Sequence, residues 1–337
     1  MSVVVTGSTG HIGANLVRAL LNNRVSTRVL VHKDRRAIEG LDVDIVAGDI
    51  RNIDSLINAF AGAEVVYHLA ADISLSRSEW PQLEAANVTG VSNVVEACLR
   101  CGVRRLVHFS SIHAMTQEPM DIPVDESRSL VDSHRCPPYD RSKAAGEREV
   151  RRGIERGLDA IIINPTAIVG IHDYRPSHFG KVLLSLANHK LPALVDGGFD
   201  WVDVRDVVEG TMRAEERAPT GAKYLLSGHW VSLPDLANLV QKIAGMPAPG
   251  FVCPLPLARF AAPIVGVFGR LAGKRPLYTS VSLRALRSNR NINHKRATLE
   301  LGYSPRPFHE TIIDTLRWFE KEGKLTKALN LESIDLP

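Results

Sequence analysis

The sequence contains 337 residues, of which 45% are hydrophobic, and its 41 basic and 37 acidic residues give a formal net charge of +4. This length and composition suit a globular protein of about two domains with a sizeable buried core. The mild charge and the scattered basic residues exclude an extended nucleic-acid-binding surface, whereas a small anionic ligand is compatible with them.

The sequence predicts neither a secretion signal nor a membrane span. Met1-Ser2 leads directly into an apolar strand, and no apolar run is long enough to cross a bilayer. The 4 cysteines are too few for a disulfide scaffold in a chain of this length. We therefore expect a cytoplasmic protein.

The first predicted elements are a strand at 3–5 and a helix at 14–22, joined by three glycines. In a dinucleotide-binding turn, one glycine allows the sharp bend, one removes a side chain where a pyrophosphate approaches, and one lets the helix pack against the strand. The helix N-terminus adds free N–H groups and the positive end of its dipole. A tight turn that binds nothing is the alternative. The sequence favours a phosphate-binding site formed by Gly7, Thr9, Gly10, His11, Ile12 and Gly13.

The end of the second predicted strand, at 26–31, indicates which dinucleotide binds. An acidic residue there binds the ribose 2′-hydroxyl of NAD, whereas a basic residue accommodates the 2′-phosphate of NADP. The strand is followed by His32 and Lys33, while Asp34 comes two residues late for the NAD role and Arg36 adds a further positive charge. The sequence therefore favours NADP(H) over NAD(H). A solvated basic turn is the alternative.

The beginning of the chain resembles a known family. Thr6-Gly7-x-x-Gly10-x-x-Gly13 is similar to the cofactor loop of the extended short-chain dehydrogenase/reductase superfamily. Asp49 is a candidate N-cap for the helix that starts near Ile53. The resemblance also gives roles to the residues that follow the predicted strands at 43–47 and 64–69. It implies that these residues line the adenine pocket and approach the cofactor ribose, namely Asp49, Ile50, Leu69, Ala70 and Ala71.

A long helix is predicted over 79–100, and it contains Asn87-Val88-Thr89-Gly90, similar to the family's Asn-Val-x-Gly. A buried asparagine there needs partners from neighbouring backbone, so a structural role stands beside a catalytic one. Cys98 and Cys101 form a Cys-x-x-Cys without a second pair. Packing is therefore favoured over a redox or zinc role, and we predict no metal site.

The candidate catalytic residues follow the fifth predicted strand, at 104–109, which runs into Ser110 and Ser111. Ligands bind at the carboxyl ends of parallel strands. Tyr139 and Lys143, at i and i+4 of the next helix, share one helix face. A neighbouring ammonium favours the phenolate, so we expect a lowered pKa for Tyr139. Tyr139 can then exchange a proton with the substrate oxygen, to which the Ser111 hydroxyl also bonds.

Ser111 matches the catalytic serine of the superfamily, and the resemblance implies that Lys143 holds the nicotinamide ribose. A serine that caps a turn is the alternative for Ser110 and Ser111. His113 and Met115 are candidate substrate contacts, since they begin the loop at 115–138.

Two further features surround this helix. Pro165 follows the sixth predicted strand, at 159–164, and the resemblance implies that it lies beside the nicotinamide. The helix itself alternates charges, which predicts a solvated face with local pairing. The residues of that face are Glu147, Arg148, Glu149, Arg151, Arg152, Glu155 and Arg156.

The alternation of strands and helices predicts an α/β fold, a Rossmann-type doubly wound parallel sheet with a smaller, mostly helical C-terminal substrate domain. Residues 1–165 and 200–228 form the predicted dinucleotide-binding domain, and residues 166–199 and 229–337 the substrate-binding domain. Residues 197–199 predict a turn and 223–227 a last strand of the main sheet. The apolar stretch 255–272 predicts a lid or core helix over an apolar substrate, with membrane-surface contact as the alternative.

The resemblance covers the whole chain and is closest to the dihydroflavonol-reductase-like branch, which adjoins the 3β-hydroxysteroid dehydrogenases. It implies NADP(H)-dependent reduction of a small-molecule carbonyl, or the reverse oxidation of an alcohol. A nucleotide-sugar epimerase or dehydratase with bound NAD is one alternative, against which the missing acidic residue after the second strand stands. A non-catalytic NADP-binding sensor is another. A homodimer paired through two long helices is an expectation from the family.

Overall fold

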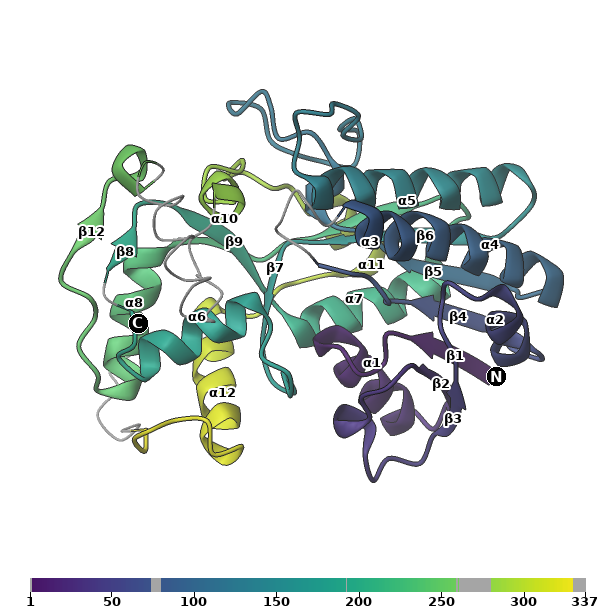
Figure 1. Ribbon diagram of the computed structural model, residues 1–337, viewed down its shortest axis with the longest axis horizontal. Coiled ribbons are helices and arrows are strands. Elements are labelled where there is room, and N and C mark those ends of the chain that lie inside the picture. Colours follow the sequence, from purple (N-terminus) through teal and green to yellow (C-terminus); the bar gives the residue numbers. More distant parts are fainter. Residues whose placement is uncertain (1, 74–79, 192, 259, 261–279, 330–337) are drawn as a thin grey trace.

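The computed structural model describes residues 2–73, 80–191, 193–258, 260 and 280–329 (Figure 1). Within these residues, seven parallel strands form one sheet in the order β10-β6-β5-β4-β1-β2-β3. The strand order reverses at β1, which is the doubly wound Rossmann arrangement, so the predicted fold class is confirmed. The strands are β1 (Ser2–Thr6), β2 (Ser26–Val31), β3 (Asp44–Ala47), β4 (Val65–His68), β5 (Arg105–Phe109), β6 (Ala160–Pro165) and β10 (Lys223–Leu226).

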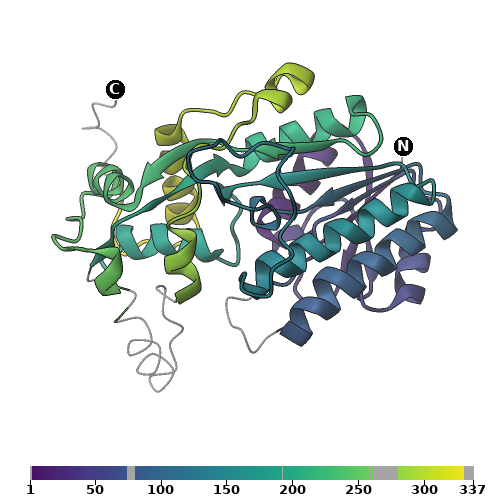
Figure 2. The same cartoon turned by 90° about the horizontal axis from the view of Figure 1, so that it is seen from above.

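Helices cover both faces of this sheet, as Figures 1 and 2 show. One layer contains α1 (His11–Asn22) and α7 (Val204–Arg217), and the other contains α2 (Ile53–Phe60), α4 (Gly90–Cys101) and α5 (Pro138–Glu155). In β1, the fully buried Val3 and Val5 join the core under α1, while Val4 joins the core on the opposite face. Both faces are therefore apolar, which explains the continuous apolar runs that mark these strands in the sequence.

The helix predicted over 79–100 is interrupted in its middle. It consists of α3 (Trp80–Glu84), a π-helical segment η3 (Ala85–Thr89) and α4, which follow one another directly. π-Helical turns occur frequently at functional sites, and this one carries Asn87. Cys98 is fully buried, and Cys101 lies 3.6 Å from the carbonyl oxygen of Ile57. The two cysteines therefore serve packing.

A second core lies beside the sheet. Trp201 and Phe319 are buried in it, and α6 (His178–Ala187), α8 (Leu233–Ala244) and α12 (Phe308–Lys321) surround it. Its strands are β7 (Ala167–Val169), β8 (Leu194–Val195), β9 (Gly198–Asp203), β11 (His229–Ser232) and β12 (Val252–Cys253). The remaining short elements are η1 (Arg36–Ile38), η4 (Ile112–Ala114), α10 (Ser280–Ala285) and α11 (Lys295–Leu301).

The second half of the chain differs from the prediction in two places. The predicted turn at 197–199 is wrong, because β9 begins at Gly198 and pairs with β11. The region after 229 contains β11 and β12 as well as helices. These strands have only four and two residues, too few for an alternating pattern to stand out. The apolar stretch 255–272 lies mostly outside the described residues.

Candidate active site

Two glycines bring the turn after β1 against the end of β4. Gly7 has a φ of +72°, and a Cβ atom there would lie 2.5 Å from the backbone nitrogen of Ala70. A Cβ atom on Gly13 would lie 2.2 Å from the carbonyl oxygen of Gly7. Because side chains have no room at either position, the backbone of the turn packs directly on Leu69 and Ala70. The structure thus brings together two predicted parts of the cofactor site.

The N-terminus of α1 is open to an anion. Gly10 is its N-cap residue, no side chain in the described part of the chain caps it, and its first turn contains no acidic residue. The first N–H groups of a helix lack intrahelical partners, and together with the helix dipole they bind phosphate groups. The bare glycine turn and this helix end therefore fit the pyrophosphate of a dinucleotide.

The ends of β2 and β3 meet where the adenosine part is expected. Nε2 of His32 lies 3.6 Å from Oδ2 of Asp49. Arg36 binds Asp34 through two hydrogen bonds of 3.0 and 2.6 Å, and this guanidinium lowers the pKa of Asp34 to about 2. Asp34 is therefore an ionised carboxylate that is already paired with a neighbouring cation.

The structure corrects one role suggested for Asp49. The N-cap of α2 is Asn52, whose side-chain oxygen accepts hydrogen bonds from the backbone nitrogens of Asp54 and Ser55. A capping residue directly precedes the first helical residue, and Asp49 stands too early. Its carboxylate instead binds Arg51, which lowers the pKa of Asp49 to about 2.

The three predicted catalytic residues lie at the carboxyl end of β5 and on the first turns of α5. The hydroxyl of Ser111 acts on the phenol of Tyr139, whose pKa it lowers. Oγ of Ser111 also accepts a hydrogen bond of 3.2 Å from the backbone nitrogen of His113. Nζ of Lys143 donates a hydrogen bond of 2.7 Å to the carbonyl oxygen of Phe109. The structure therefore gathers all three side chains at one edge of the sheet.

Burial controls the ionisation of this group. It raises the pKa of Tyr139 to about 12, against the opposing effect of the Ser111 hydroxyl. It also lowers the pKa of Lys143 to about 8, which the carboxylate of Glu147 opposes. The expected lowering of the Tyr139 pKa is therefore wrong for this structure, because loss of water around the phenol dominates. The phenol is protonated at neutral pH, as a proton donor must be.

The side chain of Asn87 forms hydrogen bonds both to the segment after β4 and to α5. Its side-chain oxygen accepts a hydrogen bond of 2.8 Å from the nitrogen of Asp72. Its Nδ2 donates to the carbonyl oxygen of Asp72 and to Oγ of Ser142, at 2.9 Å each. The side chain is buried. The role visible in the structure is a structural one, since Asn87 fixes α5 relative to the segment that follows Ala71.

We expect Asn87→Ala to lower the free energy of unfolding by about 2 to 3 kcal/mol, because it removes three hydrogen bonds made by a buried side chain. Urea unfolding measures this loss. Asn93→Ala is the matched control, since Asn93 makes one hydrogen bond of 3.1 Å to the carbonyl of Ile50, and we expect a loss of about 1 kcal/mol. Equal losses of unfolding free energy in the two variants would mean that the three hydrogen bonds of Asn87 stabilise the fold no more than the single bond of Asn93.

The two candidate substrate residues have different surroundings. Met115 is 1% exposed and packs in a small apolar cluster that includes Ile112. Its burial leaves no surface for a substrate, so the structure assigns Met115 to the core. The ring of His113 lies 6.1 Å from the ring of Tyr139, and its Nδ1 lies 3.7 Å from Oδ1 of Asp140. His113 therefore lies beside Tyr139 and remains a candidate substrate contact.

Pro165 is the last residue of β6 and stands in register with Leu226 of β10, so pairing with that strand continues through the proline. The preceding residue, Asn164, donates a hydrogen bond of 2.9 Å from Nδ2 to the carbonyl oxygen of Ser111. This bond fixes the ends of β5 and β6 next to each other, and it places Pro165 beside the catalytic edge.

Glu147 contradicts the prediction that it belongs to a solvated face, because its side chain is fully buried. One of its oxygens contacts Nζ of Lys223, and the other lies 3.3 Å from Nδ2 of Asn164. The sequence carried a signal for this placement. Tyr139, Lys143 and Glu147 stand four residues apart, so they share one helix face.

The sequence predicts a loop at 170–176, after β7, but not the contacts that this loop makes with α1. The carbonyl oxygen of Ile171 accepts a hydrogen bond of 2.9 Å from Asn15 and lies 3.0 Å from Nε2 of His11. The hydroxyl of Tyr174 accepts a hydrogen bond of 2.8 Å from Arg18. The ring of His11 is thus occupied by this loop, whereas its backbone remains at the start of α1. Contacts between such distant parts of the chain leave no local pattern.

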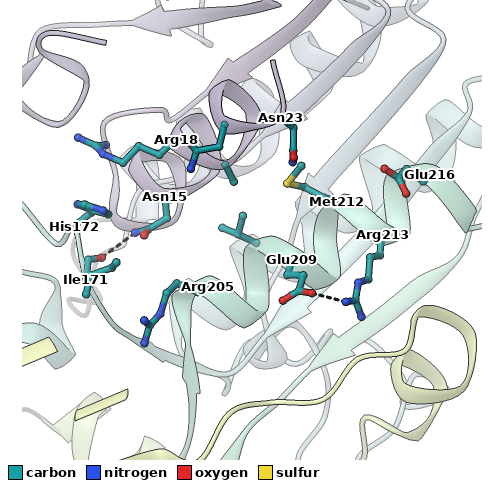
Figure 3. A pocket seen from close by; sticks show the side chains of 13 residues that line it. Asn15, Arg18, Asn23, Ile171, His172, Arg205, Glu209, Met212, Arg213 and Glu216 are labelled. Atoms are coloured by element: carbon teal, nitrogen blue, oxygen red, sulfur yellow. Dashed lines mark hydrogen bonds and ion pairs between the residues drawn. The ribbon is translucent and has the colours of Figure 1, made fainter. Parts of the chain in front are cut away.

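A groove of about 450 Å³ lies between α1 and α7 (Figure 3). Its charged side chains are engaged, since Arg213 binds Glu209 and Arg205 binds Asp203. The residues that line it include none of the predicted catalytic or cofactor-binding residues. The groove is therefore separate from the edge that carries Tyr139.

The described residues contain neither a metal-binding cluster nor a membrane-spanning helix. There, no three or more His, Cys, Asp and Glu side chains are grouped so that they can hold a metal ion. In the same part of the chain, no helix has the length and apolar character that a membrane crossing requires.

Known proteins resemble the chain over nearly its whole length. A model of the NAD dependent epimerase/dehydratase family matches residues 3–226. The chain is 33% identical over 329 residues to sterol demethylase protein B of Methylococcus capsulatus, covering 96% of this chain and 100% of that protein. It is 30% identical over 325 residues to a putative dihydroflavonol 4-reductase of Synechocystis sp., with coverages of 95% and 94%.

Among solved structures, the crystal structure of gox2253 is similar with a TM-score of 0.84 and 33% sequence identity, over 96% of this chain and 99% of that one. The fold, the family match and the relatives agree over most of the chain. The chain therefore belongs to the NAD-dependent epimerase/dehydratase family of extended short-chain dehydrogenases/reductases, and it is an NAD(P)-dependent enzyme of that family.

Proposed function

We propose that the protein reduces a carbonyl group of a small, largely apolar molecule to an alcohol with NADPH, or catalyses the reverse oxidation. The observation that carries this proposal is that Ser111, at the carboxyl end of β5, lies together with Tyr139 and Lys143 from the first turns of α5, where burial keeps the phenol protonated. A protonated phenol beside a second hydroxyl is suited to a carbonyl oxygen that gains negative charge.

Three side chains of the protein have separate roles in the proposed reaction. NADPH, when bound, supplies the hydride. Tyr139 gives its phenolic proton to the oxygen of the carbonyl, and the hydroxyl of Ser111 bonds the same oxygen and orients it. Lys143 holds the nicotinamide ribose through its buried ammonium. In the reverse direction, Tyr139 accepts the proton of the alcohol.

The remaining cofactor contacts extend along the carboxyl edge of the sheet. The glycine turn and the N-terminus of α1 hold the pyrophosphate, and Pro165 lies beside the nicotinamide. Asp49 and Ile50 line the adenine pocket, while the segment 69–71 faces a ribose. NADPH is preferred because Lys33 and Arg36 stand at the end of β2, where the single carboxylate of Asp34 is already paired.

Wild-type protein is expected to bind NADPH at least about 10-fold more tightly than NADH, since a charged hydrogen bond to a phosphate contributes about 1.5 to 3 kcal/mol. Isothermal titration measures both affinities. His32→Ala/Lys33→Ala is expected to weaken NADPH binding by about 10-fold or more and to leave NADH binding nearly unchanged. Lys190→Ala, on the surface of the second core, is the control. Equal affinities for the two cofactors in the wild type would contradict the NADPH preference.

The substrate proposal rests on relatives and on the site. Two relatives are named a sterol demethylase protein and a putative dihydroflavonol 4-reductase, and we infer an apolar ring compound as substrate class. Residues 166–199 and 229–337 are proposed as the substrate-binding domain. His113, which is partly exposed beside Tyr139, is the proposed substrate contact at the catalytic edge.

Two alternatives have distinct outcomes in the same experiments. A nucleotide-sugar epimerase or dehydratase would retain NAD through purification and would convert nucleotide sugars without net consumption of NADPH. A sensor would bind NADPH without turnover of any aldehyde or ketone. A cytoplasmic location and a homodimer remain predictions.

A further inference from the structure

A row of polar side chains crosses the sheet beneath the catalytic helix. Thr6, His68 and His108 stand in register on β1, β4 and β5, and through Ile162 of β6 the row reaches Lys223 of β10. All four polar side chains are buried. Buried polar groups are destabilising unless they are paired. This row therefore needs hydrogen-bond partners or opposite charges from α5, the helix that covers it.

Glu147 of α5 supplies the negative charge in this layer. Its carboxylate contacts the ammonium of Lys223, whose side chain is only 5% exposed, and it lies 3.2 Å from the guanidinium of Arg151. A buried carboxylate persists in its ionised form only when cations and hydrogen-bond donors surround it. Both are present here, since Lys223 and Arg151 contact one oxygen of Glu147 and Asn164 contacts the other.

The first link to the catalytic group is electrostatic. Lys143 stands one helical turn before Glu147 and is itself buried. Burial disfavours its ammonium, and the charge of Glu147 favours it. His68 and His108 give no compensating negative charge, because burial and the charge of Lys143 lower the pKa of both rings and leave them neutral. The titratable groups around Lys143 are thus His68 on β4, His108 on β5, and Tyr139 and Glu147 on its own helix.

The second link is a hydrogen-bond chain. Asn164 is fully buried, and its Nδ2 lies 3.3 Å from Oε2 of Glu147 and donates a bond of 2.9 Å to the carbonyl oxygen of Ser111. Glu147 thereby fixes the orientation of the amide that holds the backbone at Ser111. One carboxylate therefore reaches two of the three proposed catalytic residues.

We infer that Glu147 is a positioning residue of the proposed reductase site: it keeps the ammonium of Lys143 charged and, through Asn164, holds the backbone of Ser111. This inference rests on the proposed function for its catalytic consequence. Its electrostatic part concerns residues of this chain alone, and it can be tested without a substrate.

The pH dependence of kcat/KM for NADPH-dependent reduction tests the catalytic part. Reduction requires the ammonium of Lys143, so activity falls as pH rises through its titration. An opposite charge nearby shifts such a titration by about 1 to 3 pH units. We therefore expect Glu147→Gln to move the alkaline limb down by about one unit or more. Lys223→Met removes the closest cation from Glu147, so by the same argument the buried carboxylate takes up a proton, and the limb is expected to move down as well.

Glu149→Gln is the matched control. It is the same change two residues along α5, at a side chain that pairs with Arg152. We expect its pH profile to coincide with that of the wild type. Thermal unfolding and NADPH titration identify a variant that fails to fold. If Glu147→Gln fails, Lys223→Met carries the test, because the inference fixes the sign of its shift.

A second readout separates this inference from the proposed function. In protein labelled with ¹³C at lysine Cε, the resonance of Lys143 is the one that is lost in Lys143→Met, and its titration can be followed without substrate. A downward shift in Glu147→Gln supports the inference even if no carbonyl substrate is turned over. An unchanged Lys143 titration in both Glu147→Gln and Lys223→Met overturns it, even in an active reductase.

Discussion

Replacement of Tyr139 by Phe is expected to reduce kcat for carbonyl reduction by about 100- to 10,000-fold, the usual contribution of a positioned proton donor. The ring that fills the partly buried position is kept, and only the hydroxyl that meets Ser111 is lost. NADPH binding, measured by isothermal titration, should therefore stay within about twofold of the wild type. Turnover is followed by the absorbance of NADPH with a panel of aldehydes and ketones.

Tyr224→Phe provides the control, because its hydroxyl bonds to Glu300 on α11 and takes no part in the catalytic edge. We expect full turnover from this variant. Full activity of Tyr139→Phe would show that Tyr139 is not the proton donor. Of the proposed function, only NADPH binding would then remain supported.

The direction of the reaction should determine how the rate of the wild type depends on pH. With a pKa near 12, the phenol of Tyr139 is protonated throughout the neutral range, so it does not limit reduction there. Oxidation of an alcohol needs the phenolate, whose share rises about tenfold with each pH unit below that pKa. Oxidation should therefore accelerate with pH until Lys143 begins to lose its proton.

The features of this protein that the sequence predicts are those that depend on residues close together in the chain. Runs such as Val3 to Val5 must be strands covered on both faces, and Gly7 and Gly13 must bend where backbones approach each other. The separation of Tyr139 and Lys143 by one helical turn is equally local. These features are sufficient to predict the doubly wound parallel sheet and to bring the candidate catalytic residues to the carboxyl end of its strands.

The features that the sequence did not predict depend on the partners that distant segments supply. Glutamate is usually a surface residue. The burial of Glu147 is explained by its contact with Lys223, on β10. Asn87, in the π-helical segment, forms its hydrogen bond with the backbone of Asp72, which lies 15 residues earlier in the chain. Burial by the assembled fold also reversed the expected pKa shift of Tyr139, because a pattern of residues does not report how much water surrounds a phenol.

The second large effect is expected at the glycine turn, where stability and cofactor binding can be separated. Gly13→Ala places a Cβ atom 2.2 Å from the carbonyl oxygen of Gly7 and 2.7 Å from Cα of Ser8. Both are backbone atoms that cannot move without shifting β1 or α1. We expect a loss of about 3 kcal/mol or more in the free energy of unfolding, at the upper end for overpacked sites. Urea unfolding measures it.

Gly10→Ala is the matched variant in the same turn, because its added Cβ meets only the carbonyl oxygen of Gly7, at 3.3 Å, and its φ of −79° suits alanine. Its stability should change by less than about 1 kcal/mol. If the pyrophosphate lies on this turn, the new methyl group occupies the space of the phosphate, and NADPH affinity should fall by at least about 10-fold. Unchanged NADPH binding in Gly10→Ala would place the cofactor elsewhere, whereas a stable Gly13→Ala protein would show that α1 can move away from β1.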